Sequence, residues 1–275
     1  MSKTLQVTAR NASFQRWESL LANRTKRHRA GEFLVHGVRP ITLAVERGWP
    51  VRALLYDRSR PVSGWAGRLL DDAGAQRVAM SPDLLAELGE KDADPPELLA
   101  VVGMPADDFA RIPVAPDFLG LVLDRPASPG NVGSLLRSAD AFGAAGVVVT
   151  GHGADPYDPK AVRASTGSLF AVPVVRAESP REVLAWVASI RDRGVPIAVV
   201  GTDEHGPLDL ARHDLTGPTL ILVGNEARGL SAAWREACDA LVRIPIGGAA
   251  SSLNAASAGT VVLYEAARQR RGHTP

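Results

Sequence analysis

The sequence predicts an α/β protein built from two domains, and two observations support this class. Short apolar runs rich in Val, Ile and Leu alternate with segments whose apolar residues recur at helical spacing. The alternation is interrupted at residues 104–117, which contain three prolines and no clear period. We therefore predict a first domain over residues 1–105, a linker over 106–117 and a second domain over 118–275.

The first domain is expected to begin with a helix at residues 13–22, because Phe14, Trp17, Leu20 and Leu21 share one face. Alternating strands and helices then give a small α/β sheet domain. The expected segments are strand 32–37, helix 39–48, strand 51–57, helix 65–74, strand 76–80, helix 82–89 and strand 97–104.

The second domain contains apolar runs that are nearly continuous in Val, Ile and Leu. Such strands are typical of a sheet that is covered on both faces, so we expect mostly parallel pairing. We expect helices at 131–143, 179–193, 231–239 and 252–271, and strands at 118–124, 146–151, 172–177, 196–203, 218–224 and 240–246.

Bulk composition is that of an ordinary globular chain, with 45% hydrophobic and 22% charged residues. No apolar run approaches the ~20 residues that cross a bilayer, and the N-terminus lacks the apolar core of a secretory signal. The single cysteine, Cys238, excludes an internal disulfide and fits a reducing compartment. We therefore predict a cytoplasmic protein in which Cys238 is a small buried residue on a helix.

Charge is distributed unevenly along the chain. Residues 1–60 carry 12 Lys and Arg against 4 Asp and Glu, whereas the remaining residues carry 19 against 26. The basic N-terminal region fits a contact with a polyanion, and it equally fits a solvated charged face. Charge alone does not choose between these two interpretations.

Several common chemistries are disfavoured by the motifs. Gly151 and Gly153 are followed by Pro156 where a dinucleotide fingerprint requires its third glycine. The chain has neither a P-loop nor a serine nucleophile elbow, and its six histidines show no metal-ligand spacing with the cysteine. We therefore predict no metal site and disfavour a classical Rossmann-type methyltransferase.

Three polar segments follow predicted strands, where ligands of open α/β sheets gather. The first carries Asn131 and Arg137, which a helix cap and a surface side chain also explain. The second, LVGNEARGLS at 222–231, combines glycines with Glu226, and a turn capped by Ser231 also explains it. In the third, residues 243–266, polar residues Ser251, Ser252 and Asn254 open an otherwise apolar helix.

Taken in order, the three segments resemble the signature motifs of the SpoU/TrmH family of RNA ribose 2′-O-methyltransferases, within the SPOUT superfamily. The matching patterns are N-x-G-x-x-x-R, G-N-E-x-x-G-L and I-P-I-x-G-x-x-x-S-L-N, within residues 118–271. The resemblance implies a catalytic domain with a deep trefoil knot, a homodimer formed through that domain, and S-adenosylmethionine as cofactor.

The family motifs also assign roles to individual positions. Gly224, Ile244 and Leu253 match positions whose backbone surrounds the cofactor, with Gly201, Thr202, Gly229 and Ile246 as neighbours. The catalytic motif positions, all matched by this chain, are Asn131, Arg137, Glu226, Ser252 and Asn254.

The N-terminal stretch resembles the family's substrate-binding domain, an L30e-like α/β module. Its cluster NRTKRHR at residues 23–29 is expected beside a strand edge, where cations would contact RNA phosphates. The residues that we expect to bind RNA are Arg24, Lys26, Arg27 and Arg29.

For the chemistry, we hypothesise that Arg137 stabilises negative charge electrostatically, because a guanidinium stays protonated in proteins. Asn131 would orient Arg137, while Ser252 and Asn254 order the third loop. The resemblance implies 2′-O-methylation of 23S ribosomal RNA, at a uridine, with resistance to a ribosome-targeting antibiotic. The alternatives are a housekeeping ribosomal or transfer RNA methyltransferase, and an RNA-binding protein without turnover.

Overall fold

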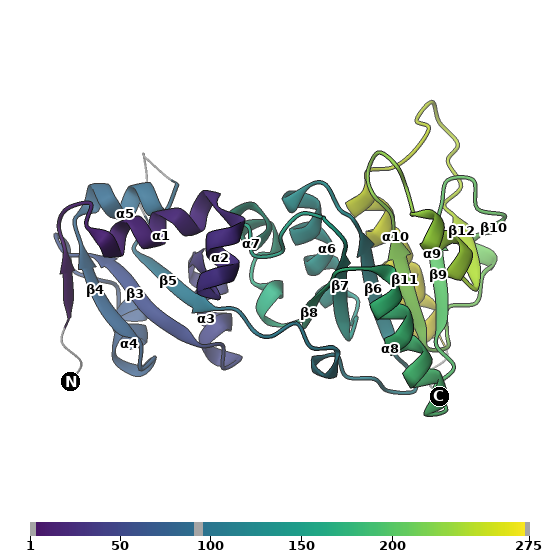
Figure 1. Ribbon diagram of the computed structural model, residues 1–275, viewed down its shortest axis with the longest axis horizontal. Coiled ribbons are helices and arrows are strands. Elements are labelled where there is room, and N and C mark those ends of the chain that lie inside the picture. Colours follow the sequence, from purple (N-terminus) through teal and green to yellow (C-terminus); the bar gives the residue numbers. More distant parts are fainter. Residues whose placement is uncertain (1–3, 91–95, 273–275) are drawn as a thin grey trace. The chain divides into compact units, whose positions relative to one another are not determined.

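The computed structural model describes residues 4–90 and 96–272, and the chain forms two compact units (Figure 1). One unit combines Met1–Pro105 with Tyr157–Ala171, and the other combines Ala106–Pro156 with Val172–Pro275. Each unit has its own sheet and its own hydrophobic core.

The first unit is built on strands β1 (Leu5–Val7), β2 (Glu32–His36), β3 (Val51–Asp57), β4 (Gln76–Met80) and β5 (Leu98–Gly103). They form a mixed sheet in the order β1-β4-β3-β5-β2, in which β5 runs antiparallel to β2 and β3. Its helices are α1 (Ala12–Ala22), α2 (Arg24–Ala30), α3 (Val38–Glu46), α4 (Gly64–Asp72) and α5 (Pro82–Leu88).

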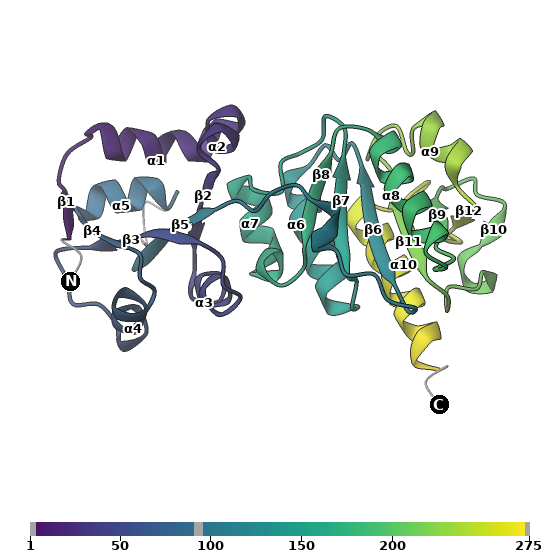
Figure 2. The same cartoon turned by 60° about the horizontal axis from the view of Figure 1, so that its bottom comes forward.

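Helices α1 and α5 cover one face of this sheet, and α3 and α4 lie on the other (Figure 2). Phe14, Trp17 and Leu20 are buried, which confirms the expected apolar face of α1. The short elements β1 and α2 were not predicted. Helix α2 begins after Asn23, whose side chain caps it by accepting from the Lys26 amide at 2.9 Å.

The segment Tyr157–Ala171 lies in the first unit and not with the rest of residues 118–275. It contains α7 (Pro159–Ser165), which was not predicted. The Phe33 ring lies 5.0 Å from that of Tyr157 and 6.2 Å from that of Phe170, and the Trp49 indole donates to the Phe170 carbonyl at 3.2 Å. These aromatic contacts bring the segment into the first core.

Residues 106–117, expected to be a linker, are packed against the second unit. Phe109 stacks on Trp186 at 5.1 Å, and Asp107 forms an ion pair with Arg176 at 2.6 Å. Arg111 donates to the Val174 carbonyl at 2.8 Å. The prolines prevent a regular period, but they do not prevent these side chains from covering the edge of the core.

The second unit contains β6 (Leu119–Asp124), β7 (Gly146–Thr150), β8 (Val174–Ala177), β9 (Ala198–Thr202), β10 (Leu208–Asp209), β11 (Thr219–Val223) and β12 (Ala240–Arg243). All pairs are parallel, in the order β10-β12-β9-β11-β6-β7-β8, as the apolar runs predicted. The short β10 was not expected, and β12 ends three residues before the predicted limit.

Helices α6 (Pro129–Ala141) and α10 (Ala255–Arg271) cover one face, and α8 (Pro180–Asp192) and α9 (Ala232–Ala237) cover the other (Figure 2). A Cβ added at Gly259 of α10 would lie 2.5 Å from Leu135 of α6, so glycine allows these two helices to approach closely. Both helices begin at the carboxyl edge of the sheet, beside the turn that follows β11.

Candidate active site

A cavity of about 400 Å³ opens at the carboxyl ends of β9, β11 and β12, the edge where open parallel sheets bind ligands. Of the residues expected to surround a cofactor, those that line it are Thr202, Gly224, Gly229, Ile244, Ile246 and Leu253. Gly201 is not among the lining residues. A Cβ there would lie 2.7 Å from the Cys238 sulfur, so this glycine serves packing behind the cavity.

Gly224 lets two backbone segments meet in the wall of the cavity. A Cβ at this position would lie 2.3 Å from the carbonyl carbon of Gly229, a separation that no side chain can accommodate. Gly229 has a φ of 62° and exchanges backbone hydrogen bonds with Asn225. The glycines of the second motif therefore build a tight turn whose backbone faces the cavity.

Glu226 fastens this turn to the start of α6. Its carboxylate accepts from the backbone amides of Ala127 and Ser128 at 2.7 and 3.1 Å, and from the Asn131 side chain at 2.9 Å. Burial alone would raise the pKa of Glu226, but these donors hold it below its ordinary value. Because both oxygens are engaged, the contacts fit an anchoring role for Glu226.

Asn131 joins the first and third motifs. Its side chain donates to Glu226, and its oxygen accepts from Asn254 Nδ2 at 3.3 Å. Asn254 also caps α10 by accepting from the amides of Ala256 and Ser257. The cap of α6 is Ser128 rather than Asn131, so the side chain of Asn131 remains available for this network.

Ser252 and Arg137 complete the expected catalytic set but lie outside the network. Ser252 is exposed and lines the cavity. Arg137 is exposed on α6, and among the described residues it has no hydrogen-bond or ion-pair partner. Asn131 and Arg137 are six residues apart, or about 1.7 helical turns, so their side chains leave the helix in different directions.

The cavity also contains polar residues that we did not predict, namely Asp203, Glu204, Asn225, Arg228 and Arg235. Asp203 directly follows β9 and forms an ion pair with Arg235. The signal that could have found Asp203 was present, because polar residues just after a parallel strand lie at the ligand edge. Asn225 was within the second motif, but its neighbours in space lie a hundred residues earlier in the chain.

Of the four cations expected to bind RNA, α2 presents Arg24, Lys26 and Arg29 at the surface. Arg27 is a correction, since it is only 2% exposed. Its guanidinium donates to the carbonyls of Leu20 and Leu21 at 2.9 Å and reaches Asp158 at 3.4 Å. Arg27 therefore ties α1, α2 and the start of α7 together and cannot reach a phosphate.

The cysteine, possible metal ligands and possible membrane-spanning helices complete the description of the chain. Cys238 lies partly buried at the end of α9, where burial together with the charge of Asp239 raises the pKa of its thiol to about 11. Within residues 4–90 and 96–272, no group of three His, Cys, Asp or Glu is placed to hold a metal ion. None of the helices in that part of the chain is long and apolar enough to cross a membrane.

Comparison with known proteins identifies relatives over both units. The 23S rRNA (uridine(2479)-2′-O)-methyltransferase of Streptomyces viridochromogenes is 63% identical over 265 residues, which cover 96% of this chain and 92% of that protein. The crystal structure of the SpoU methyltransferase AviRb from the same organism, in complex with AdoMet, superposes with a TM-score of 0.93. It is 62% identical and covers 96% of this chain and 100% of its own.

A more distant structure is similar over nearly the whole chain. The AdoMet-bound rRNA methyltransferase from Sinorhizobium meliloti superposes with a TM-score of 0.85 at 28% identity, covering 99% of both chains. Among family models, the SpoU L30e-like domain matches residues 11–100 and the SpoU rRNA methylase family matches residues 119–264. This chain is a member of the SpoU rRNA methylase family.

Proposed function

We propose that this protein uses S-adenosylmethionine to methylate the ribose 2′-hydroxyl of a uridine in 23S ribosomal RNA. The observation that carries this proposal is that the second and third motif loops line one cavity, and that Asn131 of the first motif joins Glu226 to Asn254. The 63% identity to an enzyme named for uridine methylation in 23S rRNA supports the choice of substrate.

The cavity fits the proposed cofactor in size and in chemistry. Its volume of about 400 Å³ lies within the range of small-molecule sites. Ile244, Ile246 and Leu253 offer an apolar surface for a purine ring. At Gly224 the backbone itself forms part of the cavity wall, because this residue has no side chain. The carboxylate of Glu204 at the rim suits hydroxyl or ammonium groups. S-adenosylmethionine supplies an electrophilic methyl group on a positively charged sulfur.

The residues of the chain then have to prepare the acceptor hydroxyl. A ribose hydroxyl is a poor nucleophile, so negative charge that develops on its oxygen must be stabilised. We assign this role to Arg137, whose guanidinium remains protonated and therefore acts as a charge rather than as a base. The proton leaves to solvent or to a neighbouring phosphate. Asn131 joins the turn at Glu226 to Asn254, and Ser252 and Asn254 order the third loop.

We further propose that the second unit forms a homodimer through the exposed side of α6 and α10. Val261 and Tyr264, one turn apart on α10, are 38% and 49% exposed. Tyr264 packs edge-on against Phe142, just after α6, at 5.8 Å. Arg137 is exposed on α6, so a dimer interface on this side of α6 and α10 places Arg137 beside a second copy of the chain. We expect Tyr264→Arg to yield monomers in size-exclusion chromatography with light scattering.

The finer features of the fold follow the same proposal. We infer that the chain from Ile244 to the end of α10 is threaded as the trefoil knot of the SpoU family, and that the first domain, residues 1–105, is the L30e-like module that binds RNA. The exposed cations of α2 are its proposed phosphate contacts, within a cytoplasmic enzyme. Avilamycin-type antibiotic resistance is the proposed consequence, and a lower growth-inhibitory concentration after deletion of the enzyme in its host tests it.

The decisive experiment is transfer of radiolabelled methyl from S-adenosylmethionine to 23S rRNA, followed by primer extension at low dNTP. We expect label in the RNA and one new stop next to a uridine. A stop beside another nucleotide contradicts the uridine assignment. Binding of RNA and cofactor without label in the RNA would instead identify an RNA-binding protein without turnover, and label in transfer RNA alone would identify a transfer RNA methyltransferase.

A further inference from the structure

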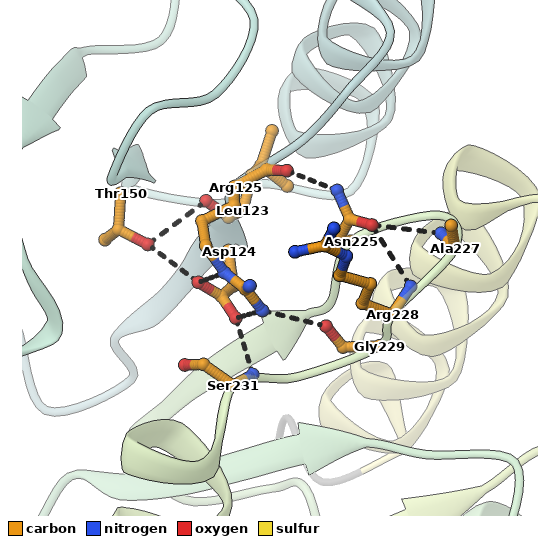
Figure 3. A network of polar contacts seen from close by, with 9 residues as sticks. All are labelled: Leu123, Asp124, Arg125, Thr150, Asn225, Ala227, Arg228, Gly229 and Ser231. Atoms are coloured by element: carbon orange, nitrogen blue, oxygen red, sulfur yellow. Dashed lines mark hydrogen bonds and ion pairs between the residues drawn. The ribbon is translucent and has the colours of Figure 1, made fainter.

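Asp124 is a buried carboxylate that no motif of the family pattern included. It ends β6, and its side chain is only 1% exposed. Figure 3 shows its oxygens surrounded by donors, namely the Arg125 guanidinium, the Ser231 amide and the Thr150 hydroxyl. The Ser231 contact, at 2.7 Å, reaches across 107 residues of chain. A carboxylate buried this deeply is tolerated only when it is paired and hydrogen-bonded.

Arg125 adopts a backbone conformation that is costly for a residue other than glycine. Its φ is 51°, in the left-handed region. This turn of the chain folds the side chain back onto its neighbour, so that Nε and Nη2 each lie 3.0 Å from an oxygen of Asp124. Nη2 also donates to the Gly229 carbonyl at 3.3 Å. The cost of the left-handed backbone is therefore offset by the hydrogen bonds of the Arg125 guanidinium, which contacts Asp124 at the end of β6 and Gly229 in the turn after β11.

The backbone of Arg125 is engaged as well. Its carbonyl accepts from Asn225 Nδ2 at 2.7 Å, and its amide donates to the Thr150 carbonyl at 3.1 Å. Asn225 in turn accepts, through Oδ1, from the amides of Ala227 and Arg228 (Figure 3). Both ends of the turn at residues 225–229 are thus tied to Arg125, one through Asn225 and the other through Gly229.

We infer that Asp124 and Arg125 are positioning residues that hold the 225–231 turn, and with it the wall of the cofactor cavity, against the loop that leads into α6. The inference rests on the proposed function, because it assigns these residues a role in binding S-adenosylmethionine. Gly229 and Arg228 line the cavity, whereas Asp124 and Arg125 do not, so the pair acts through the turn.

The pair complements the anchor that Glu226 provides on the other side of the same turn. Glu226 holds the amides of Ala127 and Ser128, which follow Arg125 in the loop. The loop and the turn are therefore joined on both sides, on one side by Asp124 and Arg125 and on the other by the Glu226 carboxylate. Loosening Arg125 frees the cofactor side of this junction while leaving the Glu226 contacts in place.

Arg125→Lys is the most informative single change. Lysine keeps a positive charge beside the buried carboxylate, but it cannot span both Asp124 oxygens and the Gly229 carbonyl. The double variant D124N/R125G removes both charges together and relieves the left-handed backbone, so no unpaired buried charge remains. The matched control is Arg176→Lys on edge strand β8, because Arg176 also pairs with a carboxylate through Nε and Nη2, which both contact Oδ2 of Asp107.

Two measurements test the inference, one for the rigidity of the turn and one for its effect on cofactor binding. Hydrogen–deuterium exchange of the cofactor-free protein reports whether the Gly229 and Ser231 amides are held, and titration calorimetry with S-adenosylmethionine reports the consequence. We expect faster exchange at these amides, and a Kd raised about tenfold, in both Arg125 variants. Arg176→Lys should change neither quantity.

Each contrary result has a separate meaning. Unchanged exchange at residues 225–231 overturns the inference, and so does faster exchange with an unchanged Kd. An equal effect of Arg176→Lys overturns it too, because the change would then reflect general loosening of the unit. If the wild-type protein does not bind S-adenosylmethionine, the proposed function fails, and the exchange experiment still decides whether Arg125 holds the turn.

Discussion

The Glu226 carboxylate accepts a hydrogen bond from the Asn131 side chain at 2.9 Å, across 95 residues of chain. Through this contact the turn after β11, which lines the cavity, is joined to the helix that carries Arg137. Asn254 extends the junction to the third loop. The acceptor side and the cofactor side of the proposed reaction are therefore parts of one hydrogen-bonded unit.

Glu226→Gln should disturb this unit without removing its volume. An amide offers one acceptor oxygen in place of two, so at least one of the Ala127, Ser128 and Asn131 donors loses its partner. We expect a loss of about 1–2 kcal/mol in the free energy of unfolding and a lower kcat. Chemical denaturation and methyl-transfer kinetics measure these effects. A variant with wild-type kcat would show that the anchor is not needed for catalysis.

The stability effect of Glu226 should depend on pH. Its pKa lies below the ordinary value of 4.5 in the folded protein, so the carboxylate stabilises the fold above that pH, and the contribution is lost as pH falls through the lowered pKa. The difference in Tm between wild type and Glu226→Gln should therefore be full at neutral pH and shrink in acid. Thermal melts across this range test it, and a difference that does not vary with pH contradicts the assignment.

Arg137 offers a sharper test of the chemistry. If its guanidinium stabilises charge on the acceptor, Arg137→Ala should lower kcat by about 10²–10³. The Kd for S-adenosylmethionine should stay unchanged, because Arg137 is not among the residues lining the cavity. Single-turnover kinetics and calorimetry separate these two effects. Nearly full activity in Arg137→Lys would show that a single positive charge is sufficient and that the planar, forked set of guanidinium donors is not required.

The exposed cations of α2 should determine how RNA binding depends on salt. Changing Lys26 and Arg29 to Gln should weaken binding to 23S rRNA fragments. The plot of the logarithm of the binding constant against the logarithm of the salt concentration should become less steep, its negative slope shrinking in magnitude by about one to two. The matched control neutralises Arg47 and Arg68, which are also exposed and belong to the α3 and α4 side of the sheet. Filter-binding titrations over a range of salt give both slopes. Equal slopes for the two variants would indicate a diffuse electrostatic contact without a defined site.

Much of the fold could be predicted because its elements carry local signals. Nearly continuous apolar strands identified the parallel sheet, and the spacing of Phe14, Trp17 and Leu20 identified α1. The assignment of Tyr157–Ala171 to the first unit could not be predicted in this way. It depends on the packing of Phe33 against Phe170, which are 137 residues apart in the chain.

The candidate site shows the same division. The motif residues were visible because they cluster after strands, and the structure brings most of them to one cavity. Arg27 looked like its basic neighbours, and only the fold turns it inward onto the Leu20 and Leu21 carbonyls. The role of Asp124 and Arg125 could not be predicted from the sequence, because their partners Ser231 and Gly229 are more than a hundred residues away in the chain.

Gly224→Ala tests the cavity wall with the smallest possible change. The added methyl would lie 2.3 Å from the Gly229 carbonyl carbon and 2.4 Å from the Leu230 nitrogen, so backbone rather than a flexible side chain must move. Overpacking of this kind costs about 1–3 kcal/mol of folding stability. Because the turn that forms the cavity wall must move, we also expect a Kd for S-adenosylmethionine that is about tenfold weaker or more. The control is Gly217→Ala, just before β11 and outside the motifs, because a Cβ there has nothing within 4 Å. Calorimetry should show weak binding only for Gly224→Ala, since only that methyl displaces the turn. Wild-type affinity in Gly224→Ala would mean that the cofactor does not depend on the backbone contact between Gly224 and Gly229.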